Sequence, residues 1–475
     1  MIISHWIFAH FLEIVGYMLA IVLIPRILLE RRHPGATLAW ILAIGLLPYV
    51  GVPLYFLIGG KRIKRIVDTM DRPPEKYPDS SCVPAEDMYP SLSRISNLMV
   101  RTGAYYPVIG NRCRVVDDGV EAFHALVELI ERAEVSIEIT TFILGRDDVG
   151  RRLVALLARK ARQGVKVKLL LDALGCFLTK GRFVQPLRDA GGQVGIFLPL
   201  LPTRSRWAAN LRNHRKMVIV DGRQALVGGM NLAKNYLGPA SYKKRWKDAI
   251  LLLEGVAVAH LRNVFRHDWA YATGEKFIRV EADCSRLSEP ELGSVVQVVA
   301  DGPAYANRRP LYSGILAALH QAEKSIWVVS PYFVPDESLS AALELAARMG
   351  RDVRLIMPER SNHPLVDLAG NSFLPDLIDA GVHLYRYQPG MIHAKLIVID
   401  GRLAVVGTVN MDIRSFQLNF ELALFLYSET DISQVLAVVE KIIADSRLVP
   451  AEEIHQRGKV REFIEDICRV FSPVL

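Results

Sequence analysis

One pattern of residue types, H-x-K-x4-D-x6-G-x-x-N, occurs twice in the chain. The copies consist of His214, Lys216, Asp221, Gly228 and Asn231, and of His393, Lys395, Asp400, Gly407 and Asn410. A His and a Lys two residues apart on a strand point to the same face of a sheet, and the Asn returns close to that face on the next strand. Each copy therefore brings an imidazole, an ammonium and an amide together.

A pocket shared by the two copies would suit a phosphate group. Ammonium and amide N–H groups donate to phosphate oxygens and stabilise the charge of a pentacovalent transition state without a metal ion or cofactor. Two histidines permit ping-pong chemistry, in which one attacks phosphorus and the other protonates the leaving oxygen. We therefore predict that Asn231 and Asn410 bind phosphate and that the catalytic set is His214, Lys216, Asp221, His393, Lys395 and Asp400.

Each element of the pattern also has an ordinary structural interpretation. Asp221 and Asp400 precede glycines, where Asp is a common turn residue. Asn231 and Asn410 could cap the segments after them. A single copy would be more typical of an edge strand with charged ends, but repetition of the whole set favours the catalytic interpretation for the His and Lys residues.

A carboxylate precedes an apolar strand at matching places, Asp248 in WKDAILLL and Glu421 in NFELALFL. A histidine that acts as nucleophile or acid needs a partner for its second ring nitrogen. We assign Asp248 to His214 and Glu421 to His393, so that each pair lies within one half of the chain.

The two motif copies belong to an internal duplication. ALVELIERAEVSIEITTFIL from Ala125 matches GILAALHQAEKSIWVVSPYFV from Gly314, and the motif segments match in the same order. Apolar strands that alternate with helices predict an α/β sandwich with both sheet faces covered, and Asp-Gly between apolar runs predicts a β-hairpin. If the halves pack about a pseudo-twofold axis, the two clusters meet in one active site.

The excess of apolar residues is concentrated in the first sixty residues. Of 475 residues, 51% are hydrophobic and 23% are charged. Two hydrophobic runs, Trp6 to Ile24 and Leu38 to Ile58, approach the ~20 residues with which a helix crosses a bilayer. We predict a membrane anchor that spans the bilayer or forms a shallow hairpin, rather than a signal peptide or a buried helical pair. Basic residues at 61–65 favour a cytoplasmic location for the rest of the chain.

The net charge of +8 implies an anionic partner. The basic clusters lack the interleaved aromatic residues of a nucleic-acid platform, so we predict an anionic lipid surface and no nucleic acid. Five scattered cysteines without a C-x-x-C pair exclude a disulfide framework and a zinc site. The predicted domains are an anchor over 1–66, a linker and lead-in helix over 67–108, a first half over 109–289, and a second half with a C-terminal helix over 290–475.

Two peripheral segments could face either protein or lipid. An extra loop at Leu198 to Asn210 is an ordinary surface loop or a contact with lipid headgroups through Trp207. Glu453 to Phe471 has helical spacing with one apolar face. We expect that face to pack against the catalytic domain, with membrane contact as the alternative.

The paired motifs resemble those of the phospholipase D superfamily, whose members carry them on a duplicated α/β fold. Within it the chain is similar, over nearly its full length, to bacterial cardiolipin synthases, through TLAWILAIGLLPYVGVPLYFLIGG, NLRNHRKMVIVDG, SPYFVPDESL, GTVNMDIRSFQLNFE and FSPVL. The resemblance implies a duplicated phospholipase D-like α/β sandwich with pseudo-twofold symmetry, preceded by a transmembrane or membrane-embedded helical hairpin. A Ser commonly follows the motif Gly in this superfamily. Thr408 keeps that hydroxyl and is a candidate phosphate ligand, whereas Gly229 lacks it.

The resemblance also implies a reaction at the bacterial inner membrane. Two phosphatidylglycerol molecules would give cardiolipin and glycerol through a phosphatidyl-histidine, without metal or nucleotide. By analogy His214 is the nucleophile and His393 the general acid and base, although pseudo-symmetry also allows the reverse. The rival functions are a phospholipase D hydrolase, a phosphodiesterase nuclease and a lipid-binding scaffold without catalysis. The oligomeric state is not predicted.

Overall fold

The computed structural model describes residues 18–29, 34–55, 90–199, 210–281, 293–303 and 308–472. The chain divides into two compact units, Met1–Thr69 with Leu200–Asn210, and Met70–Pro199 with Leu211–Leu475. The predicted hydrophobic runs lie partly, and the Trp207 loop almost wholly, outside the described residues.

The N-terminal unit contains three helices in its described part. They are a helix over residues 18–29, α2 (Pro34–Leu46) and α3 (Pro48–Leu54). Ile27, Ile44 and Tyr55 are fully buried where the helices meet, and Tyr55 lies edge-on to Trp40. Within the described residues, no helix is both long enough and apolar enough to cross a membrane.

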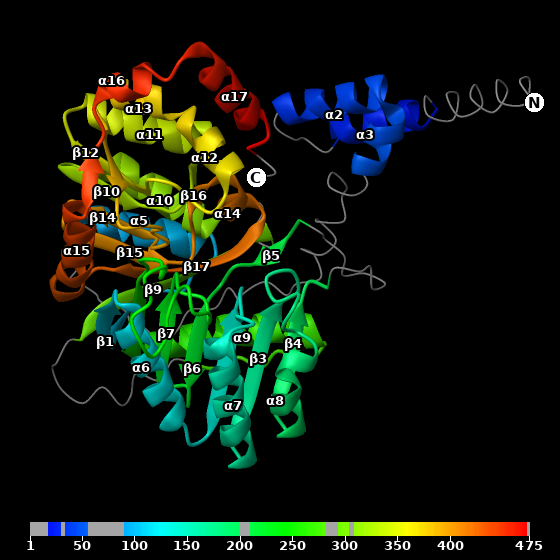
Figure 1. Ribbon diagram of the computed structural model, residues 1–475, viewed down its shortest axis with the longest axis vertical. Helices are drawn as coiled ribbons and strands as arrows, with labels where there is room; N and C mark the ends of the chain where they lie inside the picture. Colours follow the sequence, from blue (N-terminus) through cyan, green and yellow to red (C-terminus); the bar gives the residue numbers. More distant parts are fainter. Residues whose placement is uncertain are drawn as a thin grey trace, which may run out of the picture. The chain divides into compact units, whose positions relative to one another are not determined.

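The larger unit is built on one continuous sheet (Figure 1). The first half contributes β1 (Val108–Val116), β2 (Ser136–Thr141), β3 (Lys166–Asp172), β4 (Gln193–Phe197), β6 (Met217–Val220), β7 (Gln224–Gly228) and β8 (Ile250–Gly255). The second contributes β9 (Ser294–Asp301), β10 (Ser325–Val329), β12 (Asp352–Pro358), β13 (His383–Tyr387), β14 (Leu396–Ile399), β15 (Leu403–Gly407), β17 (Asn419–Leu426) and β18 (Ser446–Leu448).

The strand order confirms the duplication. From one edge to the centre the first half runs β4-β3-β2-β6-β7-β8-β1, and from the other edge the second half runs β18-β13-β12-β10-β14-β15-β17-β9. The halves join where β1 and β9 pair antiparallel. Short strands lie off this path: β5 (Arg212–Asn213) pairs with β17, and β11 (Phe333–Val334) pairs with β16 (Met411–Asp412).

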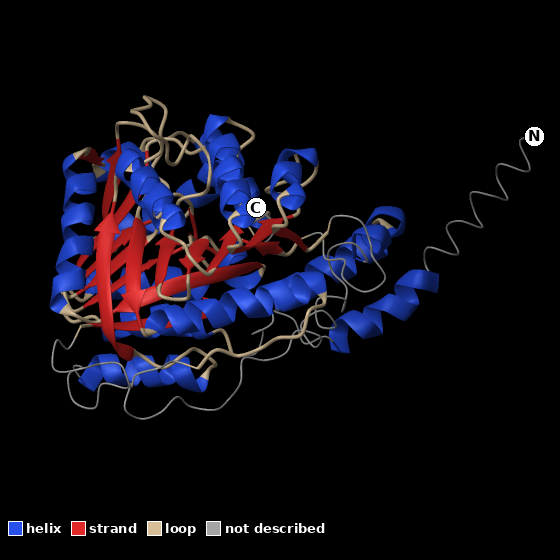
Figure 2. Ribbon diagram, turned by 90° about the horizontal axis from the view of Figure 1, so that it is seen from below, coloured by secondary structure: helices blue, strands red, loops and turns tan. Residues whose placement is uncertain are grey.

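Helices cover both faces of the sheet (Figure 2), as the alternating pattern predicts. Those of the first half are α6 (Gly119–Glu131), α7 (Asp148–Arg162), the 3₁₀ helix η3 (Arg182–Val184), α8 (Gln185–Asp189) and α9 (Ala257–Thr273). Those of the second half are α10 (Pro310–Gln321), α11 (Glu337–Arg348), α12 (Pro364–Asn371), α13 (Leu374–Asp379), α14 (Ile413–Gln417) and α15 (Glu429–Ala444). The lead-in helix α5 (Pro90–Arg101) packs on α10, where Leu92, Ile95 and Met99 join the core of the second half.

Both predicted Asp-Gly hairpins are present. β6 pairs with β7 and β14 with β15, and the Asp and Gly of each turn have positive φ, 52° and 64° at Asp221 and Gly222 and 56° and 63° at Asp400 and Gly401. Positive φ at both central residues is the geometry whose twist matches that of the flanking strands.

The C-terminal segment forms α16 (Ala451–His455) and α17 (Lys459–Val470), but the expected packing of its apolar face is wrong. The helix is held instead through its polar side. Glu465 is 1% exposed and accepts hydrogen bonds from Arg457 at 2.7 Å and Arg461 at 3.0 Å. The apolar side chains that the spacing singles out are exposed: Val460, Phe463, Ile464, Ile467, Val470 and Phe471.

Candidate active site

Each motif histidine is placed by a backbone contact with the opposite half. The His214 N–H donates to the carbonyl of Phe420 at 2.9 Å, where β5 runs parallel to the start of β17. The His393 N–H donates to the carbonyl of Lys247 at 2.6 Å, beside the bridge between Lys247 and Ile392. In both cases the residue after the accepting carbonyl is a carboxylate.

The histidines and carboxylates therefore pair across the halves, and the predicted pairing within each half is wrong. His214 Nδ1 lies 2.9 and 3.1 Å from the two carboxylate oxygens of Glu421. His393 Nδ1 lies 2.7 Å from Asp248 Oδ2. Asp248 and Glu421 occupy equivalent positions, because Ile250 and Ala423 pair with the glycines that end β7 and β15. The two pairs thus form one composite site.

The four groups are buried, and burial governs their protonation. His214 is 8% and His393 4% exposed, while the exposed fractions of Asp248 and Glu421 are 1% and 0%. Burial lowers the pKa of His214 to about 4, against the attraction of Glu421. Burial also lowers the pKa of His393, and Lys395, Lys216 and His214 lower it further. For a histidine that acts as nucleophile, a neutral imidazole that donates through Nδ1 keeps the Nε2 lone pair for attack on phosphorus.

The two carboxylates respond differently to their surroundings. Burial raises the pKa of Asp248 to about 6, although Lys395 opposes it. Burial would also raise the pKa of Glu421, but His214, Lys216 and a hydrogen bond from Thr408 outweigh it and lower that pKa. Glu421 is therefore the more firmly ionised partner.

Both motif lysines are buried and contact the histidine of their own motif. Lys216 Nζ donates to the carbonyl of His214 at 2.6 Å, and Lys395 Nζ lies 2.8 and 3.1 Å from the two ring nitrogens of His393. Burial lowers the pKa of Lys216 to about 7 and that of Lys395 to about 8. Two partly desolvated ammonium groups are strong donors for a phosphate that enters between them. No group of His, Cys, Asp and Glu in the described part of the chain is arranged to hold a metal ion.

The two motif asparagines are fixed differently. Asn231 Oδ1 accepts a hydrogen bond from the Ile143 N–H at 3.0 Å. Asn410 Nδ2 donates to Ser415 at 3.2 Å, whereas its Oδ1 is buried without a hydrogen-bond partner among the described residues. The open position of Asn410 is therefore a hydrogen-bond acceptor, which suits a donor group rather than a phosphate oxygen. Asn231 holds the end of the neighbouring strand.

The Thr408 hydroxyl, predicted as a phosphate contact, is engaged by groups of the protein itself. Its hydroxyl donates to Glu421 Oε2 and accepts from the Leu422 N–H at 3.0 Å. The equivalent Gly229 leaves room for the other carboxylate, because a Cβ there would lie 2.1 Å from Asp248 Oδ1. The exchange of Thr408 for Gly229 between the two motifs therefore determines what borders each carboxylate: a hydroxyl group beside Glu421, and a position without a side chain beside Asp248.

We expect Gly229→Ala to lower turnover by about 10–100-fold, the usual cost of displacing a group that orients a catalytic side chain. The new methyl group would push the Asp248 carboxylate away from His393. Initial rates measured on the purified variant test this. Gly181→Ala is the matched control, because a Cβ at Gly181 meets no atom within 4 Å. Equal rates for the two variants would contradict the role given to Gly229.

Asp221 and Asp400 lie in the hairpin turns, at the far ends of β6 and β14 from the motif histidines, and their prediction as catalytic residues is not supported. The Asp221 carboxylate accepts backbone N–H groups of Glu134, Val135 and Ser136 at 2.7–2.9 Å. Asp400 accepts the equivalent three N–H groups of residues 323–325 at 2.7–2.8 Å. Each carboxylate thus fixes the start of the strand that runs beside its motif, β2 or β10.

We expect Asp400→Asn to lower the free energy of unfolding by about 1–3 kcal/mol, the usual cost of losing hydrogen bonds to a charged acceptor. Asn tolerates the positive φ of this position, so the change removes acceptor capacity without new backbone strain. Thermal or denaturant unfolding measures the loss. Turnover per folded molecule should equal that of the unmodified chain, and a selective loss of turnover would return Asp400 to the catalytic set.

Sequence reasoning missed the aromatic side chains around the histidines. Tyr236 and Trp246 have ring centroids 5.0 and 5.6 Å from that of His393, and Tyr332 lies at 6.5 Å. Phe142 lies 5.1 Å from His214. Phe142 and Tyr332 follow the ends of β2 and β10, and Tyr236 and Trp246 lie between β7 and β8. Each is far along the chain from the histidine that it contacts, so no spacing signal identifies them.

Arg215, which the motif pattern directs away from the site, supports it from behind. Its side chain is buried and forms an ion pair with Asp268 at 2.6 Å. It also donates to the carbonyls of Glu421 and Asp301, each at 3.0 Å. Arg215 therefore ties the first motif to the strand of the second half that carries the partner of His214.

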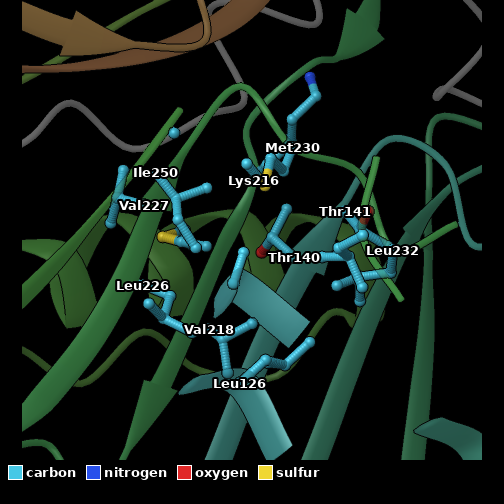
Figure 3. Close-up of a pocket in the computed structure, with 14 residues that line it drawn as sticks. Leu126, Thr140, Thr141, Lys216, Val218, Leu226, Val227, Met230, Leu232 and Ile250 are labelled. Atoms are coloured by element: carbon cyan, nitrogen blue, oxygen red, sulfur yellow. The ribbon is translucent and has the colours of Figure 1, made fainter. Parts of the chain in front are cut away.

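A small cavity lies behind Lys216 in the first half (Figure 3). Its volume is about 30 Å³, and apart from Lys216, Thr140 and Thr141 its lining is apolar, with Leu126 and Ile250 among the residues drawn. Figure 3 shows the Lys216 ammonium pointing away from this cavity. A space of this size holds about one or two water molecules and no acyl chain.

Comparison with known proteins gives consistent matches. The family model "Cardiolipin synthase, PLD-like domain" matches residues 126–269 and 315–443, and "Phospholipase_D-nuclease N-terminal" matches residues 18–60. A cardiolipin synthase of Geobacillus kaustophilus (strain HTA426) is 36% identical over 457 residues, covering 94% of this chain and 90% of that protein. Cardiolipin synthase 2 of Bacillus anthracis is 34% identical over 458 residues, covering 94% and 88%.

Among solved structures, the phosphatidylserine synthase of Haemophilus influenzae Rd KW20 has a similar fold. It superimposes with a TM-score of 0.62 at 15% identity, and the match covers 81% of this chain and 100% of that chain. At this identity the likeness concerns the fold alone.

Proposed function

The chain belongs to the cardiolipin synthase family of the phospholipase D superfamily, and we propose that it joins two phosphatidylglycerol molecules into cardiolipin with release of glycerol. It is a phosphatidyltransferase whose reaction proceeds through a phosphatidyl-histidine. The observation that carries this proposal is the composite site, in which each motif histidine is held through Nδ1 by a carboxylate of the other half.

In the first step, Nε2 of one histidine attacks the phosphorus of a donor phosphatidylglycerol. The second histidine enters the step protonated at Nε2, a form that the anionic phosphate of the bound donor favours. The bond from phosphorus to the headgroup glycerol breaks, and the Nε2 proton passes to the glycerol oxygen. Lys216 and Lys395 stabilise the charge on the phosphoryl oxygens. In the second step, the same second histidine takes a proton from the headgroup hydroxyl of another phosphatidylglycerol, whose oxygen displaces the first histidine.

We assign the nucleophile to His214 and the acid–base role to His393. The lowered pKa of Glu421 supports this assignment, because a carboxylate that stays ionised strengthens the adjacent imidazole as a nucleophile. The raised pKa of Asp248 suits a histidine that must both give and take a proton in each cycle.

We further propose that the protein acts at the cytoplasmic face of the bacterial inner membrane. The apolar runs of the N-terminal sixty residues, the basic residues directly after them and the net charge of +8 support attachment to an anionic membrane. Burial of both histidines supports transfer over hydrolysis, because bulk water has little access to the intermediate.

Purified full-length protein incubated with phosphatidylglycerol vesicles should produce cardiolipin and glycerol in equal amounts. Lipid mass spectrometry and an enzymatic glycerol assay measure the two products. The His393→Ala variant, incubated in parallel, controls for contaminating activity. If phosphatidic acid dominates and cardiolipin is absent, the chain is a hydrolase and the proposal fails.

A further inference from the structure

Two groups of exposed apolar side chains lie near the site and have no role in the reaction. One is the face of α17 formed by Val460, Phe463, Ile464, Ile467, Val470 and Phe471, whose exposed fractions run from 44% to 76%. The other is the turn after β3, where Leu174, Phe177 and Leu178 are 48%, 58% and 66% exposed. We call the two groups together the docking rim.

The turn after β3 borders the first motif. β3 runs parallel to β2, and the motif strand β6 runs antiparallel to β2, so the carboxyl end of β3 lies at the edge from which His214 projects. Asp172, the last residue of β3, accepts the Asn213 N–H at 3.0 Å. The apolar turn begins two residues later, and Lys180 lies over the Phe177 ring at 4.8 Å.

α17 borders the second motif through α12. The two helices pack side by side, and Arg457 donates to the carbonyl of Asn371, the last residue of α12, at 2.9 Å. At the other end of α12, the His363 ring lies 5.4 Å from Tyr332, which in turn faces His393. The exposed face of α17 is therefore one helix away from the second histidine.

Exposed cations stand at the same edge. Lys234, Lys243 and Lys244 belong to the segment whose Tyr236 and Trp246 touch the His393 ring. Each of the three lysines is exposed, and none forms an ion pair with a residue in the described ranges. Apolar side chains flanked by lysines match the chemistry of an anionic lipid leaflet, with acyl chains below and phosphate above.

We propose that the docking rim inserts into an anionic lipid leaflet and holds the site against the membrane during transfer. This inference rests on the proposed function, because a two-chain substrate must bring its headgroup to buried histidines. The cavity behind Lys216 is too small to take the acyl chains. Docking by the rim gives the catalytic unit a fixed distance from the headgroups that the N-terminal attachment alone does not provide.

Fluorescence quenching by labelled lipid tests the proposal directly. Phe463→Cys is made in a full-length chain with Cys82→Ser and Cys284→Ser, because Cys113, Cys176 and Cys468 are buried. The new thiol is labelled with the fluorophore NBD and mixed with phosphatidylglycerol–phosphatidylcholine vesicles that contain doxyl-labelled phosphatidylcholine. We expect blue-shifted emission that shallow doxyl groups quench.

The matched control is Met349→Cys in the same background. Met349 is 61% exposed, similar to Phe463 at 65%. It directly precedes β12, so it lies beside the strand ends opposite to those that carry the motif histidines. Its label should stay unshifted and unquenched. A label at 463 that is blue-shifted but not quenched would show that protein, from this chain or a second copy, covers the face, and the proposal would be overturned. So would an unshifted label at 463.

A second measurement separates docking from chemistry. Phe463→Glu with Ile467→Glu should lower transfer on vesicles by about tenfold or more, because two inserted apolar groups are lost. The rate in detergent micelles, which do not require docking to a bilayer, should stay unchanged. Equal rates for variant and parent on vesicles overturn the proposal. Quenching needs no turnover, so a chain that docks but makes no cardiolipin refutes the proposed function and leaves the docking rim standing.

Discussion

The His393→Ala variant should release p-nitrophenolate from phosphatidyl-p-nitrophenol in one stoichiometric burst and then stop. The His214→Ala variant should give no burst. With phosphatidylglycerol as the donor, both variants should lose at least about a thousandfold in turnover, because nucleophilic and acid–base catalysis are each removed.

The difference between the two substrates follows from the leaving group. Glycerol leaves as a poor, basic alkoxide unless an acid protonates it, whereas p-nitrophenolate leaves without a proton. A site that keeps His214, Lys216 and Lys395 can therefore still form the phosphatidyl-histidine from the activated ester. The intermediate then accumulates, because the acceptor hydroxyl has no base to take its proton.

Stopped-flow absorbance measures the burst, and mass spectrometry of the digested protein locates the phosphatidyl group on the peptide that contains His214. His320→Ala, on the exposed end of α10, controls for loss of any histidine. A burst in His214→Ala and none in His393→Ala would exchange the two roles. Full turnover of phosphatidylglycerol by either variant would show that the histidine it lacks takes no part in the reaction, and the proposed mechanism would fail.

The chemistry of the site was predictable because it is repeated. The same spacing separates the histidine and lysine of each motif, His214 from Lys216 and His393 from Lys395, and on a strand this spacing puts both side chains on one face. In the structure the two pairs are buried close enough together to influence one another's pKa values. The same repetition misled at Asp221 and Asp400. A residue that recurs in both halves can serve either their common fold or their common chemistry. Here the repeated Asp holds three backbone N–H groups from its turn, whereas the repeated His and Lys belong to the reacting site.

Partners that depend on long-range pairing were not predictable. The sequence identified Asp248 and Glu421 as carboxylates at strand starts, but their assignment needs the contact of β5 with β17 and of Lys247 with Ile392. These segments are far apart along the chain, and nothing in their composition specifies which half each will meet. The predicted packing of the apolar face of α17 was wrong for a related reason. Helical spacing identifies an apolar face but not what covers it.

The crossed pairing makes Glu421 and Asp248 separable by kinetics. We expect Glu421→Gln to lower the burst rate on phosphatidyl-p-nitrophenol by about 10²–10⁴-fold, the range from loss of an orienting group to loss of the correct histidine tautomer. The substituted side chain would present an amide that cannot act as an ionised acceptor for both the His214 ring and the Thr408 hydroxyl. The nucleophile itself is then misaligned.

Asp248→Asn should leave that burst intact and slow every later turnover instead. Its carboxylate orients His393, which the activated ester does not need in the first step but the acceptor hydroxyl needs in the second. Glu138→Gln is the control, because Glu138 is also buried in the first half but pairs with Arg262 away from the site. Pairing within each half would produce the reverse pattern, with the burst lost in Asp248→Asn and kept in Glu421→Gln. The burst rates of these two isosteric variants therefore decide which half supplies the partner of the nucleophile, and with it whether either half alone could hold a working histidine.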